Sequence, residues 1–202
     1  IVHRLSAECV GRHNMFMNHV RFLDEKKEVV YSQPADTIKT AFTTPFQNLI
    51  VGRDIYNKRK RLVSSKKDFT QSNYLSLEMI HSILRDLVFM DYVPDDKRYK
   101  ITPDDRDFLL RHMAMYPRES IYPTFPQKTF YDSFKKYFIY GNTVEKITED
   151  SLRIFNIVGR AYGYIIDCAY IVNYKTKTEF MLSAVTFNNA RNSFGTGSYE
   201  YT

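Results

Sequence analysis

Two Ser-x-x-Lys patterns occur in the chain, Ser64…Lys67 and Ser133…Lys136. When both residues lie on one helix face, a lysine one turn after a serine can take the hydroxyl proton, which makes the serine a nucleophile for acyl transfer. Ser64 lies in a basic loop, where the pair would not share a helix face. Ser133 and Lys136 could share one. In a chain rich in serine and lysine, we interpret both patterns as chance occurrences.

The five histidines form no HExxH pattern and no close pair, so we expect no metal site and no cofactor. His112 lies on the apolar face of a predicted helix and is expected to be a core residue with a satisfied ring. Cys9 and Cys168 are far apart, which excludes a CxxC motif and permits one disulfide.

The composition is that of an ordinary globular domain, with 202 residues, 44% of them hydrophobic and 26% charged. No apolar run approaches the roughly 20 residues of a membrane span.

Much of the formal net charge of +6 comes from residues 57–67. We interpret this segment as a solvated hairpin tip and expect no nucleic-acid partner, since no zinc pattern or recognised nucleic-acid motif accompanies it. Nucleic-acid binding remains the least favoured of three hypotheses on function, the other two being given below, and it would require salt-sensitive binding at Lys58–Arg61.

The first part of the chain predicts short β elements followed by helices. Residues 20–31 resemble a hairpin, and residues 49–52 and 61–63 suggest a second pairing with 57–61 at its tip. Helices are predicted at 76–89 and from Thr102 to Pro117.

Good capping residues begin both helices, Ser76 for the first and Thr102 before Pro103 for the second. A shorter helix is predicted at 131–139. The second helix should turn an apolar stripe inward, made of Phe108, Leu109, His112, Met113 and Tyr116.

The end of the chain predicts a β-meander with strands at 152–158, 162–174 and 179–187. The middle strand is apolar on both faces, which is typical of a strand covered on both sides. The predicted fold class is therefore α+β, an antiparallel sheet with packed helices. We expect residues 1–187 to belong to one domain and 188–202 to form a loose tail.

The segment Arg153–Gly163 resembles the Lys-Thr-Gly strand of class A β-lactamases and penicillin-binding proteins. Nearly the whole chain resembles, in order, a Bacteroidetes-type group of β-lactamase-related serine hydrolases, many of them lipoproteins. The phrases similar to that group are His3-Arg4-Leu5-Ser6, Asn18 with Val20-Arg21-Phe22, Ser76-Leu77-Glu78, Pro117-Arg118-Glu119-Ser120, Tyr131-Asp132-Ser133 and Arg153–Asn156.

The resemblance implies a β-lactamase/transpeptidase-like fold, incomplete at its N-terminus, and a site along this strand. The residues expected to bind substrate are Asn156, Ile157, Val158, Gly159, Arg160 and Gly163, with Asn14 and Asn18 in a neighbouring loop. The strand is expected to reverse after its glycine, and the backbone N–H of Arg160 to donate to an oxyanion. Ile157 replaces the usual lysine and cannot bind a carboxylate. Arg160 is a candidate substitute cation, and Ile157→Lys is expected to improve capture of carboxylated substrates.

The resemblance therefore implies a serine hydrolase that forms an acyl-enzyme with a β-lactam or peptide-like amide. We expect no catalytic residue within this chain, because the family places its Ser-x-x-Lys nucleophile upstream and Ser133 lies too close before the Gly159 strand. The alternative is a non-catalytic binding or scaffold module for peptide or cell-wall fragments. The family implies a small-molecule or peptide substrate, an extracytoplasmic location, and membrane contact only through an upstream lipid anchor.

Overall fold

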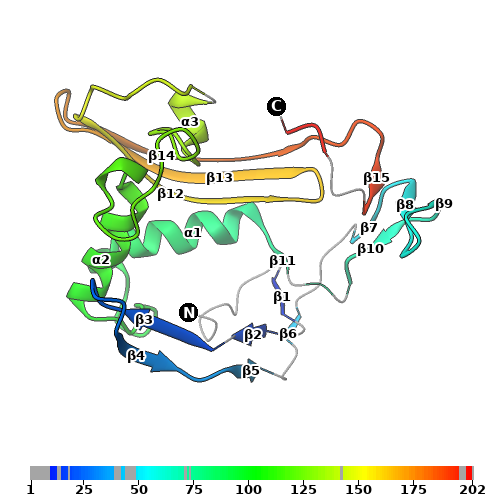
Figure 1. The fold of residues 1–202 in the computed structure, drawn as a ribbon, viewed down its shortest axis with the longest axis horizontal. Helices are drawn as coiled ribbons and strands as arrows, with labels where there is room; N and C mark the ends of the chain where they lie inside the picture. Colours follow the sequence, from blue (N-terminus) through cyan, green and yellow to red (C-terminus); the bar gives the residue numbers. More distant parts are fainter. Residues whose placement is uncertain are drawn as a thin grey trace.

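The computed structural model describes residues 10–12, 15–17, 19–38, 42–43, 49–70, 72, 74–141, 143–195 and 199–201. The fold class is α+β, as predicted: helices pack on an antiparallel sheet, and smaller β elements lie at one end and below it (Figure 1).

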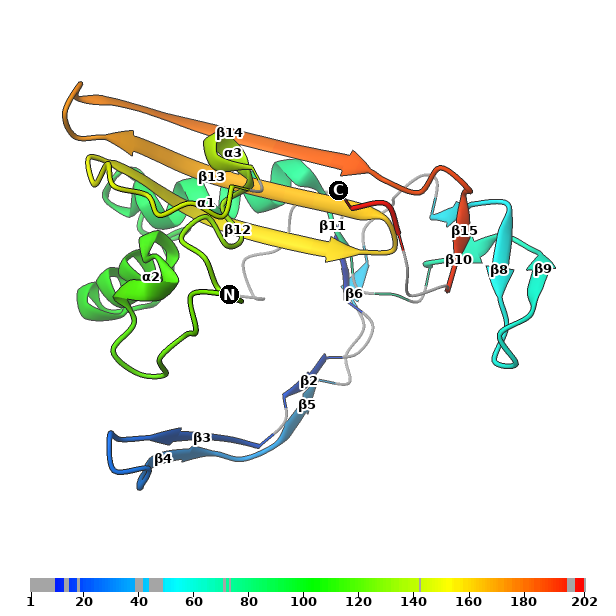
Figure 2. The ribbon, with the colours of Figure 1, turned by 45° about the horizontal axis from the view of Figure 1, so that its top comes forward.

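The sheet consists of three ten-residue strands, β12 (Leu152–Ala161), β13 (Tyr164–Asn173) and β14 (Thr178–Phe187). They pair in the order β12-β13-β14, so β13 is central, as predicted from its apolar residues. Figure 2 shows the three strands side by side. The predicted end of β12 at residue 158 is wrong. The strand continues through Gly159 to Ala161, and the chain reverses at Tyr162 and Gly163, whose φ angles of 56° and 88° make a tight turn.

Apolar clusters cover both faces of the sheet. On one face Cys168 packs with Leu84 and Val88, which belong to helix α1 (Leu77–Val88). Ile154, Ala169 and Ile171 form a cluster on the other face, packed against Phe138 and Tyr140 of α3 (Tyr137–Tyr140). The helix α1 therefore lies against one face and α3 against the opposite one (Figure 1).

Polar contacts add to the packing of α1. His81 Nδ1 lies 2.7 Å from Ser183 Oγ, and that hydroxyl lies 3.0 Å from Cys168 Sγ. Cys168 is buried and free, and Cys9, the other half of the disulfide that the sequence permits, lies outside the described residues.

The two long helices begin where their capping residues predict. Ser76 accepts from the N–H of Met79, and Thr102 and Asp105 form a reciprocal capping box at the start of α2 (Pro103–Ala114). A short 3-10 helix follows each of them, η2 (Met90–Tyr92) after α1 and η3 (Pro117–Glu119) after α2.

The predicted inward stripe of α2 is wrong in part. Phe108 is 60% exposed and Leu109 36%, whereas Leu110 and Met113 pack against the core. His112 is also exposed and bonds to the carbonyl of Phe108, so it is not a core residue. The face of α2 that packs on the core therefore differs from the predicted one, because it includes Leu110, which was not among the predicted inward residues.

The short helix predicted at 131–139 is also wrong. Residues 131–136 form turns, and the single turn labelled α3 contains non-helical angles at Phe138 and Ile139. The physical reason is tertiary: Ser133 donates to the carbonyl of Thr143 and Lys136 reaches β12, so side-chain contacts override the local helical pattern.

The smaller β elements are hairpins and short pairings. The predicted hairpin at 20–31 is confirmed as β3 (Val20–Leu23) and β4 (Val29–Gln33). The second predicted pairing is corrected, because the strand that follows the tip covers residues 62–64 and pairs with β8 (Asp54–Tyr56), not with 49–52. Residues 57–61 do form the tip. The other short strands are β1 (Val10–Arg12), β2 (Met15–Met17), β5 (Asp36–Ile38), β6 (Phe42–Thr43), β7 (Ile50–Val51), β9 (Leu62–Ser64), β10 (Lys67–Asp68) and β11 (Tyr74–Leu75).

The segment after β14 is not a loose tail where the structure describes it. Strand β15 (Ser193–Phe194) pairs in parallel with β8, and Phe194 is buried with Phe69 and Tyr162 around its ring. A Cβ atom at Gly52 would lie 2.4 Å from that ring, so only glycine fits there. The aromatic contacts join β15 to Tyr162 in the turn between β12 and β13, and the pairing of β15 with β8 links the β8–β9 hairpin to the same turn.

The α1 face of the sheet carries the first prediction. Leu84→Ala should lower the free energy of unfolding by about 2–5 kcal/mol, because the fully buried side chain leaves a cavity. Leu109→Ala is the matched control and should change it by less than about 1 kcal/mol. Urea unfolding measures both. Equal effects would mean that α1 does not cover this face as described.

Candidate functional site

The turn between β12 and β13 determines which backbone groups of β12 are free. Tyr162 and Gly163 are the two residues of the turn, and Ala161 pairs with Tyr164. In a two-residue hairpin the flanking residues exchange both hydrogen bonds, and along the ladder such pairs alternate with non-bonded ones. Odd-numbered residues of β12 therefore bond to β13, and even-numbered residues point their N–H and C=O groups away from it.

Two side-chain contacts agree with this alternation. The carbonyl of Leu152 accepts from the hydroxyl of Tyr116 at 3.1 Å, and that of Ile154 accepts from Lys136 Nζ at 2.7 Å. By the same alternation the N–H of Arg160 points away from β13, toward the edge of the sheet. No strand of the described chain pairs with that edge. The N–H therefore points to where it could donate a hydrogen bond to an acceptor outside the sheet.

The side chains of Ile157 and Arg160 lie on opposite faces of the sheet, because their separation is odd and side chains alternate along a strand. Ile157 packs against the apolar cluster on the α1 face. The guanidinium of Arg160 lies 4.9 Å from the ring of Tyr201. Arg160 therefore does not place a cation where a lysine at position 157 would place one, and a lysine introduced at 157 would extend along apolar neighbours.

Both glycines of the predicted site have structural roles. A Cβ atom at Gly159 would lie 2.8 Å from Ile166 Cγ2. Gly163 has φ of 88°, which other residues rarely adopt, and its N–H donates to the hydroxyl of Tyr201. Val158 shares the outward backbone direction of Arg160. These glycines shape the edge, and packing alone accounts for them.

Asn156 belongs to a buried polar network and its amide is fully used. Lys136 Nζ donates to Asn156 Oδ1 at 2.8 Å, to the carbonyl of Ile154, and to the carbonyl of Met113. The Asn156 amide nitrogen donates to the carbonyl of Lys135 at 2.7 Å and to Asp167 Oδ1 at 2.9 Å. The structure thus places Asn156 as a link between a buried lysine and a buried aspartate.

Burial shifts the pKa values of both charged ends of this network. Desolvation lowers the pKa of Lys136 to about 8, with Asp167 opposing the shift. Desolvation raises the pKa of Asp167, although Asn156 and the N–H groups of Phe138 and Tyr137 act against it. Sequence reasoning missed this network. The available signal was Asp167 itself, a carboxylate in the middle of an otherwise apolar central strand.

Neither Ser-x-x-Lys pattern forms a nucleophile and base. Ser133 is 1% exposed and its hydroxyl donates to the carbonyl of Thr143, while the ammonium of Lys136 is held by other acceptors. Ser64 is in β9 and Lys67 in β10, and these strands belong to different pairings. The interpretation of both patterns as chance is therefore supported by the geometry of the residues involved.

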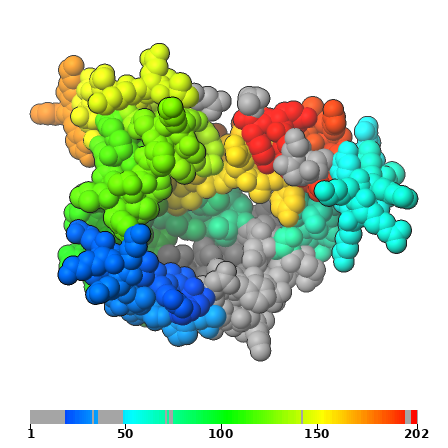
Figure 3. Space-filling view, in the orientation of Figure 1, coloured from blue at the N-terminus to red at the C-terminus, as the bar shows by residue number. Residues whose placement is uncertain are grey.

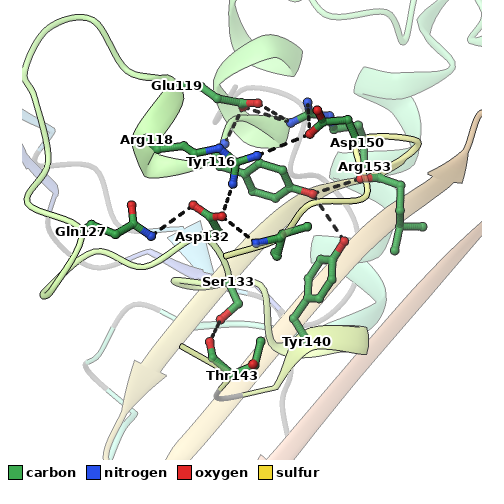
Figure 4. A network of polar contacts seen from close by, with 12 residues as sticks. Tyr116, Arg118, Glu119, Gln127, Asp132, Ser133, Tyr140, Thr143, Asp150 and Arg153 are labelled. Carbon is green, nitrogen blue, oxygen red and sulfur yellow. Dashed lines mark hydrogen bonds and ion pairs between the residues drawn. The ribbon is translucent and has the colours of Figure 1, made fainter. Parts of the chain in front are cut away.

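A second polar network fixes the chain that leads into β12 (Figure 4). Tyr116 is fully buried, and the guanidinium groups of Arg118 and Arg153 lie 4.9 Å and 4.6 Å from its ring. Glu119 accepts from Arg153 at 2.9 Å and 3.0 Å. Burial raises the pKa of Tyr116 above its usual value.

Asp132 is the buried acceptor at the other end of this network. It binds Arg118, the N–H of Ile147 at 2.8 Å and the amide of Gln127 at 3.2 Å (Figure 4). Three separate phrases on which the resemblance is based, at 117–120, 131–133 and 153–156, thus meet in space. Their contacts anchor the loop from η3 to β12, and both carboxylate oxygens of Asp132 accept hydrogen bonds.

An open recess of about 300 Å³ lies beside this second network, and its lining includes Arg111, Phe155 and Tyr174. It does not include Gly159 or Arg160, so it is separate from the edge predicted to bind substrate. Asn14 and Asn18 lie outside the described residues. Within the described ranges, no group of three or more His, Cys, Asp or Glu side chains could hold a metal ion.

Comparison with family models, with curated proteins and with solved structures finds no match for this chain. None of the helices in the described part is long and apolar enough to cross a membrane.

The buried Lys136 gives a pH-dependent prediction. In the unfolded chain the lysine keeps its proton up to about pH 10.5, and in the folded chain only to about 8. Between these values the unfolded state binds more protons, so the free energy of unfolding should rise with pH, by on the order of 3 kcal/mol. Lys136→Met should lack this rise, which makes the difference between the two proteins grow with pH.

Denaturant unfolding at several pH values measures this difference. Lys135→Met is the matched control, because its ammonium is less buried and contacts the hydroxyl of Tyr137 at 3.4 Å and the ring of Phe134 at 5.3 Å. Parallel pH profiles for native protein and Lys136→Met would contradict the account of the network.

Proposed function

We propose that this chain carries the substrate-binding edge of an acyl-transferring serine hydrolase of β-lactamase/penicillin-binding type. The observation that carries the proposal is the N–H of Arg160, directed outward from the free edge of β12 immediately after Gly159. An N–H fixed in a strand can donate to a carbonyl oxygen as negative charge develops on it during nucleophilic attack. Because the donor belongs to the backbone, this role does not require the lysine that Ile157 replaces.

The order of elements supports the same proposal. Helices α1 and α2 precede a strand that borders the candidate site, and two antiparallel strands follow it. The nucleophile is proposed to lie outside the described residues, since Ser64 and Ser133 are unsuited to the role. The proposed substrate class is a β-lactam or peptide-like amide. An extracytoplasmic, lipid-anchored protein is proposed from the resemblance alone.

A non-catalytic binding module is the second candidate function. It is favoured by one observation, that no serine and lysine of the described chain share a helix face in the required arrangement. In that case the edge of β12 would bind a peptide or cell-wall fragment through its free backbone groups without forming an acyl-enzyme.

The oxyanion role of Arg160 can be tested with two substitutions at one position. Arg160→Pro removes the N–H, and an edge strand tolerates proline where the N–H makes no ladder bond. Arg160→Ala removes the same guanidinium and keeps the N–H. In the complete polypeptide that the gene encodes, Arg160→Pro should lower kcat about 10²–10³-fold relative to Arg160→Ala.

Hydrolysis of a chromogenic β-lactam or acyl ester measures this ratio, and circular dichroism checks that both variants fold. Equal kcat for the proline and alanine variants would exclude the proposed donor. If the complete polypeptide neither hydrolyses such substrates nor forms an adduct with them, the binding module is the better account.

The chain of 202 residues by itself should show no serine-hydrolase turnover. The reason is that Ser133 is buried with its hydroxyl engaged, and Ser64 and Lys67 lie in strands of different pairings and not on one helix face. Labelling with a fluorescent penicillin and mass spectrometry measures acylation. Stoichiometric labelling of Ser64 or Ser133, with hydrolysis lost on Ser→Ala, would contradict the prediction.

A further inference from the structure

The tip of the β8–β9 hairpin and the residues that lead from β9 into β10 are densely positive. Residues 57–67 contain six cations and no acid, as many positive charges as the formal net charge of the whole chain. The cations are Lys58, Arg59, Lys60, Arg61, Lys66 and Lys67. The hairpin forms a protrusion at one end of the molecule, seen at the right of Figure 3 in cyan.

The tip of this hairpin is held in one conformation by its own hydrogen bonds. Asn57 Oδ1 accepts from the N–H of Arg59 at 2.9 Å and of Arg61 at 3.1 Å. The N–H of Asn57 donates to the carbonyl of Arg61, and Lys60 takes a positive φ of 56°. Four consecutive cations are therefore presented on a formed turn, which reduces the conformational entropy that binding would cost.

The charges of the tip are not neutralised by the part of the chain that the structure describes. Its ion pairs involve none of Lys58, Arg59, Lys60 and Arg61, and all four side chains are exposed. The acid nearest to the tip in the sequence, Asp54, pairs with Arg53 at 2.7 Å. A partner of opposite charge would meet these cations unpaired.

Exposed aliphatic side chains follow directly after the cations. Leu62 is 51% exposed and Val63 37%. Basic residues beside exposed aliphatic groups suit the interface of an anionic bilayer, where the charges meet phosphate groups and the aliphatic groups enter the headgroup region. A nucleic-acid interface would instead use aromatic rings to stack on bases or amides to read them, and the tip from Lys58 to Val63 contains neither.

We propose that the β8–β9 hairpin is a contact site for an anionic phospholipid membrane. The hairpin is attached to the turn of β12 and β13 through β15 and through Lys67, whose ammonium lies 5.8 Å from the ring of Tyr162. Contact with a membrane there would place the Arg160 end of the sheet near the lipid surface. The proposal does not depend on the hydrolase function.

Sedimentation with vesicles of phosphatidylcholine containing about one quarter phosphatidylglycerol tests the site. The native chain should bind these vesicles, bind pure phosphatidylcholine weakly, and lose binding as salt is raised. Each cation near an anionic surface contributes about a fivefold factor. Changing Lys58, Arg59, Lys60 and Arg61 to Gln should therefore lower partitioning several-hundred-fold.

The charge-matched control replaces Lys26, Lys27, Lys175 and Lys177 by Gln. These four exposed lysines lie at the tips of the β3–β4 and β13–β14 hairpins, and the control lowers the net charge by the same amount. It should keep most of the binding. Equal loss in both variants would mean that overall charge, and not this hairpin, attracts the vesicles, and would overturn the proposal.

A second variant, Leu62→Ser with Val63→Ser, distinguishes a membrane from another polyanion. It should weaken vesicle binding by at least tenfold and leave binding to duplex DNA unchanged, because only a bilayer interface receives aliphatic side chains. Native binding to DNA as tight as to vesicles at equal phosphate concentration would identify a nucleic-acid surface instead. Absence of vesicle binding at low salt would also overturn the proposal.

Discussion

The pairing of β12 with β13 is the constraint on which the rest of the structure depends. The tight turn at Tyr162 and Gly163 fixes the register of all ten residue pairs in this ladder. That register decides which backbone groups are used within the sheet and which point from its edge. It also decides that Ile157 faces α1 while Arg160 faces the other side. A shift by one residue would exchange both sets, so the position of every group in the candidate site depends on this turn.

The two halves of the free edge of β12 differ in whether their backbone groups have partners within the chain. Its first half is satisfied by the chain itself, because Tyr116 and Lys136 donate to the carbonyls of Leu152 and Ile154. Both donors are buried side chains that tie the long loop before β12 to the sheet. The second half, around Arg160, has no such internal partner strand in the described chain. The buried networks thus stabilise the edge at one end, and the proposed function uses the backbone at the other.

The sequence predicted those elements that local patterns determine. Ser76 and Thr102 began α1 and α2 where their caps indicated, and the three-stranded meander followed from apolar alternation and a turn. The failures have tertiary causes. Lys136 lies in a segment with a helical pattern, but its ammonium is buried against β12, and the segment forms turns. Leu109 and His112 fitted a helical stripe, yet the packing of α2 selects Leu110. The Lys136–Asn156–Asp167 network joins residues up to 31 positions apart, and no local pattern records it.

The central claim is that the N–H of Arg160 lies at the site where an acyl group reacts. A crystal structure of the complete polypeptide with a covalently bound β-lactam or boronate tests it most directly. The proposal predicts an acyl or boronate oxygen at roughly 2.7–3.1 Å from the Arg160 nitrogen. The account would be contradicted if another strand paired with β12 at Arg160, or if the bound group lay elsewhere with this N–H unoccupied.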